Sequence, residues 1–267
     1  MPELPEVETI CCDLNKQILG QTIQDVRVLD PRVLRQSPQV FKKSLIGQKI
    51  EDIYRRGKAI VFQLSNGNML VVQLMMTGQL VVGERAHAHT RVSLELMDHV
   101  VHYHDQRVFG QLRVIKDMQE LPYFQRLGPE PLDPAFNLDY VKARLARSRR
   151  PIKNMLLDHA FVAGIGNIYA SEILFRSKIS PLRLSQQLKA KEIGALLIQV
   201  HDVLKEAILR RGTSMRNYVD AQGQKGQFNQ AIQVYGRAAE PCLVCRKAIV
   251  RLVQAGRSTF YCPKCQR

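Results

Sequence analysis

No stretch of about 18 consecutive apolar residues, the length that a membrane-spanning helix needs, occurs in this 267-residue sequence. The sequence also has no internal repeat and no long low-complexity tract, so a repeat architecture is not expected. Its first residues are acidic and interrupted by proline, a pattern that does not fit a secretion signal or a transit peptide. These absences predict a protein of the cytoplasm or the nucleoid with no membrane partner.

Acidic residues are scarce in the second half of the chain. Residues 1–135 carry 16 Lys and Arg against 16 Asp and Glu, whereas residues 136–267 carry 23 against 8. The formal net charge of +15 therefore comes entirely from residues 136–267. A basic surface confined to one part of a protein attracts polyanions, and a nucleic-acid backbone is the simplest such partner. A soluble protein that is merely basic is the alternative.

Four of the six cysteines form two Cys-x2-Cys pairs, Cys242 with Cys245 and Cys262 with Cys265, separated by 16 residues. Two such pairs at this separation are typical of a structural zinc site, in which four thiolates close a tetrahedral shell and leave no position for a catalytic water. Two disulfides are the alternative, but a chain without a targeting signal is expected to stay in a reducing compartment. We therefore predict one structural Zn²⁺.

Apolar periodicity predicts a helix followed by short strands in the first half of the chain. Pro5 suits the first position of a helix, an apolar stripe follows it, and Gly20 ends it. We expect strands at Ile23–Val28, Lys49–Tyr54, Ala59–Leu64, Met69–Leu74, Val92–Leu96, Val100–Tyr103 and Phe109–Ile115. Short antiparallel strands joined by turns predict a β-sandwich with the N-terminal helix packed on it, within an α+β chain.

Helical patterns replace strands after a proline-rich linker at residues 127–134. We expect helices at Tyr140–Ala146, Pro151–Asp158, Asn167–Phe175 and Ser185–Arg211. The third of these helices follows a glycine-rich turn, and Asn167 is expected to be its N-cap. Backbone N–H groups at such a helix start can bind an anion, and a plain turn between helices is the alternative.

Pro2 becomes the N-terminal residue once Met1 is removed. An N-terminal proline is a secondary amine, and its attack on the C1′ carbon of a sugar yields a cationic iminium that favours elimination. An α-amino group titrates at about pH 7.7–8, so part of the population is nucleophilic near neutrality. Glu3 adds an acid–base group beside this amine. The alternative is that Pro2 only permits removal of Met1 and starts a helix.

Four segments carry a resemblance to a known family: PELPEVET at 2–9, GIGNIYASE at 164–172, QVYGR at 233–237 and RSTFYCPKC at 257–265. Together, in this order and at this spacing, they resemble formamidopyrimidine-DNA glycosylase over the whole chain. The resemblance implies three domains, which are a β-sandwich catalytic domain at 1–133, a helix-two-turn-helix DNA-binding domain at 134–232 and a zinc finger at 233–267. It also implies that double-stranded DNA lies between the first domain and the other two, and we expect a monomer.

The resemblance assigns four catalytic residues. Pro2 matches the nucleophile that forms the imine, and Glu3 matches the proton donor that assists opening of the sugar ring and departure of the base. Lys58 matches a lysine assigned to β-elimination and phosphate contact, although by itself it is typical of a solvated charge beside a strand. Arg257 matches an arginine of the zinc module that binds phosphate near the lesion and is linked to δ-elimination.

Further residues match DNA-contacting positions of the family. An enzyme that acts on a sugar carbon must extrude the nucleotide, and the resemblance assigns Met76, Arg107 and Phe109 to the gap that remains in the duplex. Strand periodicity alone would place Met76 and Phe109 in the core. Residues 214–228 match a flexible loop that covers the damaged base. The other residues that we expect to contact DNA are His89, Arg149, Lys153 and Asn167.

The sequence departs from the family pattern at three positions. Gln73 stands where close relatives usually have His, and Val108 replaces a common second Arg or Lys beside the gap-filling arginine. Ser148 falls where a DNA-binding lysine is expected. Arg149 is our assigned substitute for that lysine, with Arg147 and Arg150 as alternatives. These departures affect DNA contacts and leave the expected catalytic residues intact.

The sequence therefore predicts a bifunctional DNA glycosylase/AP lyase that removes oxidised purines, such as 8-oxoguanine and formamidopyrimidines, from double-stranded DNA. One alternative is a pyrimidine-lesion glycosylase of the endonuclease-eight type, but Leu4 and the Val-Glu-Thr at 7–9 favour the purine branch. A second alternative is a non-catalytic, zinc-containing protein that binds damaged DNA. Pro2, Glu3 and Lys58 argue against it, because binding alone needs no imine chemistry.

Overall fold

The computed structural model describes residues 1–83, 85–215 and 217–267, which form two compact units. Unit 1 comprises Met1–Gln125 and Ile208–Asn229, and unit 2 comprises Arg126–Ala207 and Gln230–Arg267. The segment Ile208–Asn229 therefore returns to the unit that contains the N-terminus. The three domains expected at 1–133, 134–232 and 233–267 stay a prediction.

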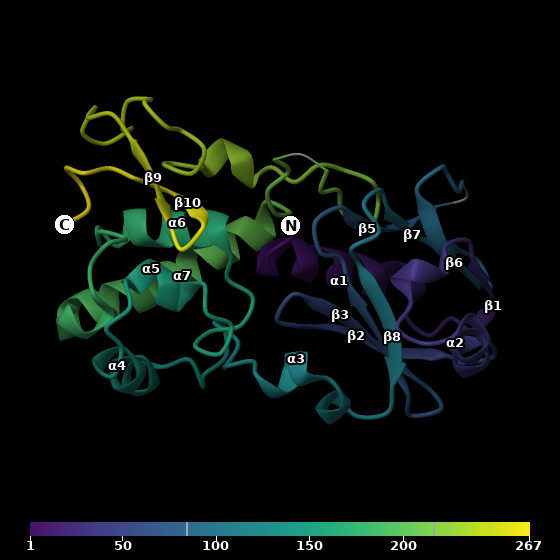
Figure 1. Cartoon of the computed structure of the whole chain (residues 1–267). Coiled ribbons are helices and arrows are strands. Elements are labelled where there is room, and N and C mark those ends of the chain that lie inside the picture. The colour runs from purple at the N-terminus through teal and green to yellow at the C-terminus, as the bar shows by residue number, and fades with distance from the viewer. Residues whose placement is uncertain (84, 216) are drawn as a thin grey trace. The chain divides into compact units, whose positions relative to one another are not determined.

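Unit 1 is a β-sandwich with a helix packed against it, as predicted (Figure 1). One antiparallel sheet has the order β1-β6-β7-β5 and consists of β1 (Ile23–Val28), β6 (Thr90–Leu96), β7 (Val100–Asp105) and β5 (Gly78–Val82). The other has the order β2-β3-β4-β8 and consists of β2 (Ile50–Arg56), β3 (Ala59–Leu64), β4 (Met69–Gln73) and β8 (Gln111–Ile115). Helix α1 (Leu4–Ile18) packs on β2, and apolar side chains of α1 and of both sheets share one core.

Several elements of unit 1 differ from the sequence-based expectation. Strand β5 and the short helix α2 (Pro38–Leu45) were not predicted. The last strand begins at Gln111 and not at Phe109, and the N–H of Gly110 donates to the Asp105 carboxylate and not to a neighbouring strand. A further short helix, α3 (Pro122–Gln125), ends the N-terminal part of the unit.

Unit 2 contains the remaining helices, which are α4 (Leu138–Ala146), α5 (Ile152–Leu156), α6 (Asn167–Arg176) and α7 (Ala190–Leu209). The last two residues of α7 fall in unit 1. The hairpin of β9 (Val250–Gln254) and β10 (Arg257–Tyr261) packs beside α6 (Figure 1). Within residues 1–83, 85–215 and 217–267, no helix is both long and apolar enough to span a bilayer.

Two expectations for the helices of unit 2 were wrong. Gly166, and not Asn167, is the N-cap of α6: Gly166 has an extended φ of −128°, and the Asn167 side chain bonds elsewhere. The helix expected to begin at Ser185 begins at Ala190. Ser185–Gln187 is a separate 3₁₀ turn, because Leu188 returns to an extended ψ of 130°.

Candidate functional site

The start of α1 holds Pro2 and Glu3 within unit 1. Glu3 is the N-cap: its carboxylate accepts the N–H of Glu6, and Glu6 Oε2 accepts the N–H of Glu3 at 2.7 Å. All three side chains are buried. This reciprocal capping fixes the direction in which the chain enters the helix, so Pro2 is held in one place. Met1 precedes Pro2 here, and the Pro2 nitrogen becomes a secondary amine only after Met1 is removed.

Lys58 lies in the two-residue turn between β2 and β3. Gly57 precedes it with a φ of 60°, which the first central residue of a type II′ hairpin turn requires. The Lys58 N–H donates to the Tyr123 hydroxyl at 2.9 Å, and Arg55 donates to the Gly57 carbonyl at 3.0 Å. Arg55 also pairs with Glu8 of α1 at 2.8 Å. The turn that carries Lys58 is therefore tied to the helix that begins at the candidate nucleophile.

Met76, Arg107 and Phe109 are exposed on turns that precede β5 and β8. Met76 is 46% exposed and Phe109 is 49% exposed, so the strand-periodicity alternative, which placed both in the core, is wrong. The guanidinium carbon of Arg107 lies 4.5 Å from the centre of the Phe109 ring. Exposed apolar side chains beside a cation suit insertion into a base stack, and the gap-filling role of the three residues stays a prediction.

The buried carboxylate of Asp105, which was not predicted as a site residue, holds these two turns together. Its Oδ1 accepts the Thr77 hydroxyl at 2.5 Å and the Arg107 N–H at 3.2 Å, and its Oδ2 accepts the Gly110 N–H at 2.7 Å. Val108 sits between these contacts at a φ of 56°, which a β-branched residue rarely adopts. A strained backbone held by a buried carboxylate is typical of a turn that positions a functional side chain.

His89 is exposed directly before β6. Its N–H donates to His87 Nδ1 at 3.1 Å, and its carbonyl accepts the Asp105 N–H at 2.9 Å. His87 stacks on His104 with ring centres 3.8 Å apart. Burial, followed by the charge of His87, lowers the pKa of His104 to about 4, so His104 is uncharged at neutral pH. These contacts hold the backbone of His89 and leave its ring at the surface.

Residues 213–228, which include the segment expected to cover the damaged base, begin at a contact with α1. Glu6 Oε1 accepts the N–H of Thr213 at 2.7 Å. The same carboxylate binds the N–H of Glu3 through its other oxygen. One buried side chain therefore connects the N-terminal end of α1, which carries the candidate nucleophile, with the start of this segment. Arg216 lies outside the described residues.

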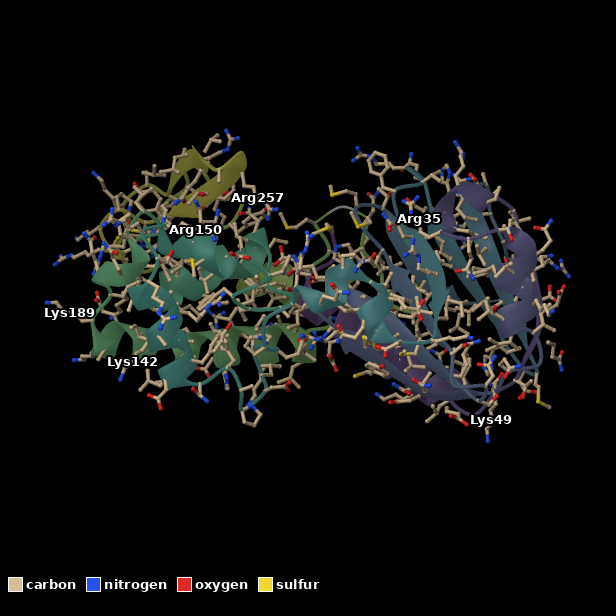
Figure 2. The ribbon with its side chains drawn as sticks, turned by 60° about the horizontal axis from the view of Figure 1, so that its bottom comes forward. Arg35, Lys49, Lys142, Arg150, Lys189 and Arg257 are labelled. Atoms are coloured by element: carbon tan, nitrogen blue, oxygen red, sulfur yellow. The ribbon has the colours of Figure 1, made fainter. Side chains whose placement is uncertain are left out.

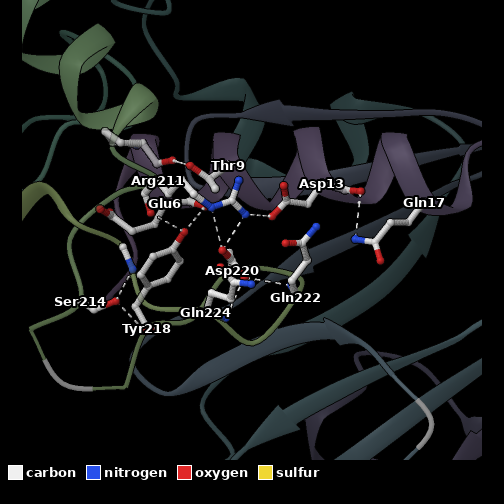
Figure 3. A network of polar contacts seen from close by, with 12 residues as sticks. Glu6, Thr9, Asp13, Gln17, Arg211, Ser214, Tyr218, Asp220, Gln222 and Gln224 are labelled. Atoms are coloured by element: carbon white, nitrogen blue, oxygen red, sulfur yellow. Dashed lines mark hydrogen bonds and ion pairs between the residues drawn. The ribbon is translucent and has the colours of Figure 1, made fainter.

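A second contact with α1 is made by Arg211, in the left-handed conformation (φ 61°) after α7. Its guanidinium donates to Asp13 of α1 at 2.5 Å and to Asp220 at 2.6 Å (Figure 3). Both carboxylates are buried, and Asp220 also accepts two backbone N–H groups of its own segment. Tyr218 donates to the Arg211 carbonyl at 3.1 Å. The segment is thus anchored at both its start and its middle.

Lys153 and Asn167 lie together against the zinc hairpin of unit 2, which consists of β9 and β10. Lys153 is 1% exposed, and its Nζ donates to the Ser258 carbonyl at 3.0 Å and to the Thr259 hydroxyl at 2.8 Å. Asn167 Nδ2 donates to the same carbonyl at 2.9 Å. Ser258 follows Arg257, whose side chain is exposed at the start of β10 (Figure 2). Lys153 and Asn167 therefore position the backbone beside Arg257. Direct contact of Lys153 and Asn167 with DNA stays a prediction.

Arg149 differs from its neighbour Arg150 in the contacts that it makes. Arg150 donates to Asp158 at 2.6 Å and to the Asn154 carbonyl at 3.1 Å. Partial burial opposes ionisation of Asp158, but hydrogen bonds from Arg150 and the Ala160 N–H, together with the charges of Arg150 and Arg144, hold the pKa of Asp158 below its usual value. Arg149 is exposed and forms no ion pair with any described residue. Its guanidinium is open to phosphate, which supports Arg149 over Arg150 as the substitute at this position.

Glu172 joins two of the sequence segments that carry the family resemblance, and it was not predicted as a site residue. Its carboxylate is fully buried and accepts the N–H groups of Gln233, Val234 and Tyr235 at 2.8, 3.0 and 2.9 Å. Burial raises the pKa of Glu172, and the three N–H groups oppose that rise. Glu172 therefore holds the turn at residues 233–235, which leads into the zinc module, against α6.

We expect the Glu172→Gln variant to loosen this junction. An amide offers one acceptor oxygen and places an NH₂ group against a backbone N–H, so at least one buried donor loses its partner. Such a loss costs roughly 1–3 kcal/mol, which corresponds to about 5- to 150-fold faster hydrogen exchange at residues 233–235 if exchange occurs by local opening. Exchange measured by mass spectrometry tests this. Glu240→Gln, at an exposed carboxylate paired with Arg237, is the matched control, and equal protection in both variants would contradict the assignment.

The four cysteines predicted to bind zinc lie together in unit 2. Their Sγ atoms all lie within 4.8 Å of one another, with 3.9 Å between Cys242 and Cys265 and 3.4 Å between Cys245 and Cys262. A tetrahedral ion with Zn–S bonds of about 2.3 Å needs Sγ–Sγ edges of about 3.8 Å. The cluster therefore fits one structural Zn²⁺. Its apolar surroundings include Phe175 of α6, which links the zinc module to the helices.

Three protein-family models match the chain in consecutive segments. The formamidopyrimidine-DNA glycosylase N-terminal domain matches residues 1–112, and the formamidopyrimidine-DNA glycosylase H2TH domain matches residues 127–219. The zinc finger found in FPG and IleRS matches residues 239–267. Together, the three matches cover the candidate nucleophile, the basic helical region and the four cysteines.

Relatives of known name match over the full length. The formamidopyrimidine-DNA glycosylases of Desulfitobacterium hafniense and Geobacillus kaustophilus are each 41% identical, over all of this chain and all of theirs. The crystal structure of the MutM (Fpg) protein from Thermus thermophilus superposes with a TM-score of 0.91 at 39% identity, covering 99% of this chain and 98% of that one. The complex of Lactococcus lactis Fpg with DNA containing an abasic site gives 0.93 at 36%, covering 99% of each.

Proposed function

We infer that this chain, which belongs to the formamidopyrimidine-DNA glycosylase family, is a base-excision-repair enzyme with both DNA glycosylase and AP lyase activity. Its substrate is double-stranded DNA that contains oxidised purines, 8-oxoguanine and formamidopyrimidines among them. Solved relatives include Lactococcus lactis Fpg in complex with DNA containing Fapy-dG. The observation that carries the proposal is the placement of Pro2 beside the buried Glu3, at a capped helix start.

The proposed reaction begins with the Pro2 amine. Its nitrogen attacks C1′ of the damaged nucleotide, the bond from C1′ to the base breaks, and the base leaves with a proton. Glu3 supplies the proton that opens the sugar ring. The resulting iminium at C1′ acidifies the C2′ hydrogen, so a base removes this proton and the 3′ phosphate leaves. A second elimination releases the 5′ phosphate, and hydrolysis of the imine returns the Pro2 amine.

Lys58 and Arg257 are proposed to act on the phosphates and protons of these eliminations. The turn that holds Lys58 is tied to α1 through Arg55 and Glu8, which supports a fixed position relative to the nucleophile. Arg257 is exposed at the start of the zinc hairpin, and bound zinc supplies rigidity there without taking part in the chemistry. Lys153 and Asn167 hold the carbonyl next to Arg257.

The remaining DNA contacts are proposed from position and exposure. Met76, Phe109 and Arg107 fill the gap left by the extruded nucleotide, while His89 and Arg149 contact the backbone. We further propose that the enzyme works as a monomer in the cytoplasm, at the nucleoid. The three functional domains are proposed to end at residues 133, 232 and 267.

Cleavage of defined duplexes tests the proposed function. A labelled duplex with one 8-oxoguanine opposite cytosine should be cut at the lesion to leave phosphorylated ends, and an undamaged duplex should stay intact. A third duplex with an oxidised pyrimidine at the same position should be cut more slowly. Faster cleavage of the pyrimidine duplex would favour the endonuclease-eight alternative, and binding without cleavage would favour the non-catalytic one.

We expect the Arg107→Ala variant to lose discrimination between bases opposite the lesion. Arginine carries N–H donors and no acceptor, so it suits the adjacent O2 and N3 acceptors of cytosine. Adenine presents its N6 donor beside N1, and one contact is lost. Such a contact is worth roughly 1–3 kcal/mol, or about tenfold in cleavage rate. The measurement compares 8-oxoguanine opposite cytosine and opposite adenine in wild type and variant, with cleavage at a preformed abasic site as the control. A variant with the full wild-type preference would show that Arg107 does not read the opposite base.

A further inference from the structure

A cavity of about 170 Å³ opens on the outer face of the β2-β3-β4-β8 sheet in unit 1. A water molecule takes about 30 Å³ in the liquid, so the cavity has room for a small hydrated anion. No acidic side chain is among the described residues that line it. These residues are Arg35, Val71, Gln73, Gln111, Arg113, Leu121, Pro122 and Tyr123.

Two cross-strand pairs build the floor of this cavity. Val71 of β4 faces Arg113 of β8, and Gln73 faces Gln111. Residues two positions apart on a strand point to the same face, so the two pairs present one polar surface. This surface therefore carries a guanidinium and two side-chain amides on a rigid sheet.

Arg35 forms a wall of the cavity from a segment that runs along the edge strand β8. The Arg35 N–H donates to the Leu112 carbonyl at 3.1 Å, and Val114 of β8 donates its N–H to the Gln36 side chain at 2.9 Å. These bonds fix the backbone of Arg35 beside the strand that carries Arg113. Two arginines from different segments therefore meet at one cavity.

Neither arginine is neutralised by another described residue. In the part of the chain that the structure describes, Arg35 and Arg113 form no ion pair. Arg55 of β2, in contrast, pairs with Glu8 of α1. A guanidinium offers a planar fork of N–H donors and no acceptor, and it binds phosphate oxygens with charge-assisted hydrogen bonds. The two guanidinium groups, together with the neutral amide donors of the glutamines in the same cavity, suit a tetrahedral anion.

The cavity is joined to the turn that carries Lys58. Gln73 in its floor pairs with Ala59, the residue after Lys58. Tyr123 in its wall accepts the N–H of Lys58 at 2.9 Å. An anion bound here is therefore a near neighbour of the phosphate that Lys58 is proposed to contact. Successive phosphates at short, regular spacing are a property of a nucleic-acid strand and not of a free anion.

We propose that this cavity binds a backbone phosphodiester of the DNA duplex, outside the lesion nucleotide, through Arg35 and Arg113. The proposal rests on the proposed function, since it takes DNA as the ligand. The two arginines anchor the strand beside the Lys58 turn. Gln73 stands where close relatives usually have histidine, so a weaker phosphate contact is expected there. The two arginines supply cationic contacts close to that position.

A series of DNA duplexes, each with one uncharged backbone phosphate, tests this proposal. Each backbone phosphate around a stable abasic-site analogue is replaced in turn by methylphosphonate, and the dissociation constant is measured by fluorescence anisotropy. In the wild type, we expect one position outside the lesion nucleotide at which the replacement weakens binding roughly tenfold, the loss typical of charge-assisted hydrogen bonds. In the Arg35→Gln/Arg113→Gln variant, that replacement should have no further effect, and the other sensitive positions should keep theirs.

Lys49→Gln is the matched control, because it removes one cation directly before β2, outside the residues that line the cavity. Arg35 and Lys49 lie at opposite edges of unit 1 in Figure 2. The control variant should keep the wild-type profile. If the double variant keeps that profile too, while the wild type binds and cleaves lesion DNA, the cavity assignment is overturned and the proposed function stands. If the wild type neither binds nor cleaves, the proposed function fails and the cavity assignment fails with it.

Discussion

We expect the Cys262→Ser variant to bind no zinc and to cleave no lesion-containing DNA. Cys262 is fully buried, and its Sγ lies 3.4 Å from that of Cys245. Structural zinc contributes roughly 10–16 kcal/mol to the folding of such modules, which is as large as the stability of a typical whole domain. Without the ion, the β9–β10 hairpin should unfold, and Arg257 should lose its position at the start of β10.

Cys12→Ser is the matched control for this variant, since Cys12 is an exposed thiol on α1 outside the cluster. The control should hold one zinc ion per chain and cleave at the wild-type rate. Metal content is measured by elemental analysis, and limited proteolysis should show Met1–Gln125 still folded in Cys262→Ser. The structural role of zinc would be refuted if Cys262→Ser were free of metal and cleaved normally.

The second large effect is expected from blocking the Pro2 nitrogen. A variant with two extra residues before Pro2 carries an amide at this position, and an amide nitrogen forms no imine. Loss of a covalent nucleophile reduces the rate by several orders of magnitude, so borohydride should trap no protein–DNA adduct and strand cleavage should disappear.

Pro2→Gly separates the loss of the amine from a change in the helix start. The mature variant has a primary amine, which also forms an imine, so part of the trapping should remain. Its Glu3 and Glu6 capping contacts use backbone and carboxylate groups that the substitution leaves in place. Equal trapping by the extended protein and the wild type would rule out Pro2 as the nucleophile.

The β-sandwich was predictable because local patterns and tertiary pairing agree in most of its strands. Strand β1 has the predicted bounds Ile23–Val28, and β3 and β4 flank the dipeptide Asn66-Gly67, which is typical of a hairpin turn. Strand β5 was missed because Gly78–Val82 is short and begins with glycine. It is a strand because it pairs with β7, whose partner residues lie 19 to 27 positions further along the chain.

The chemistry of the candidate site could be predicted from motifs, but the contacts that position it could not. Lys153 has the sequence pattern of a solvated cation, yet its ammonium group is buried against Ser258, 105 positions away. The Glu172 carboxylate binds backbone groups about 62 positions further along the chain. Asp105 resembles any acidic residue at a strand end. Burial of a charge depends on its partners, and a single sequence does not show which distant segments meet.

Locating the DNA on the trapped protein is the most direct test of the central claim, that the Pro2 amine forms the imine. The mature enzyme is reduced with borohydride during cleavage of 8-oxoguanine DNA, digested with a protease and a nuclease, and analysed by mass spectrometry. The account predicts a sugar remnant on the peptide that begins at Pro2, attached at its N-terminal nitrogen. A remnant on Lys58, or on any other lysine, with an unmodified Pro2 peptide would contradict it.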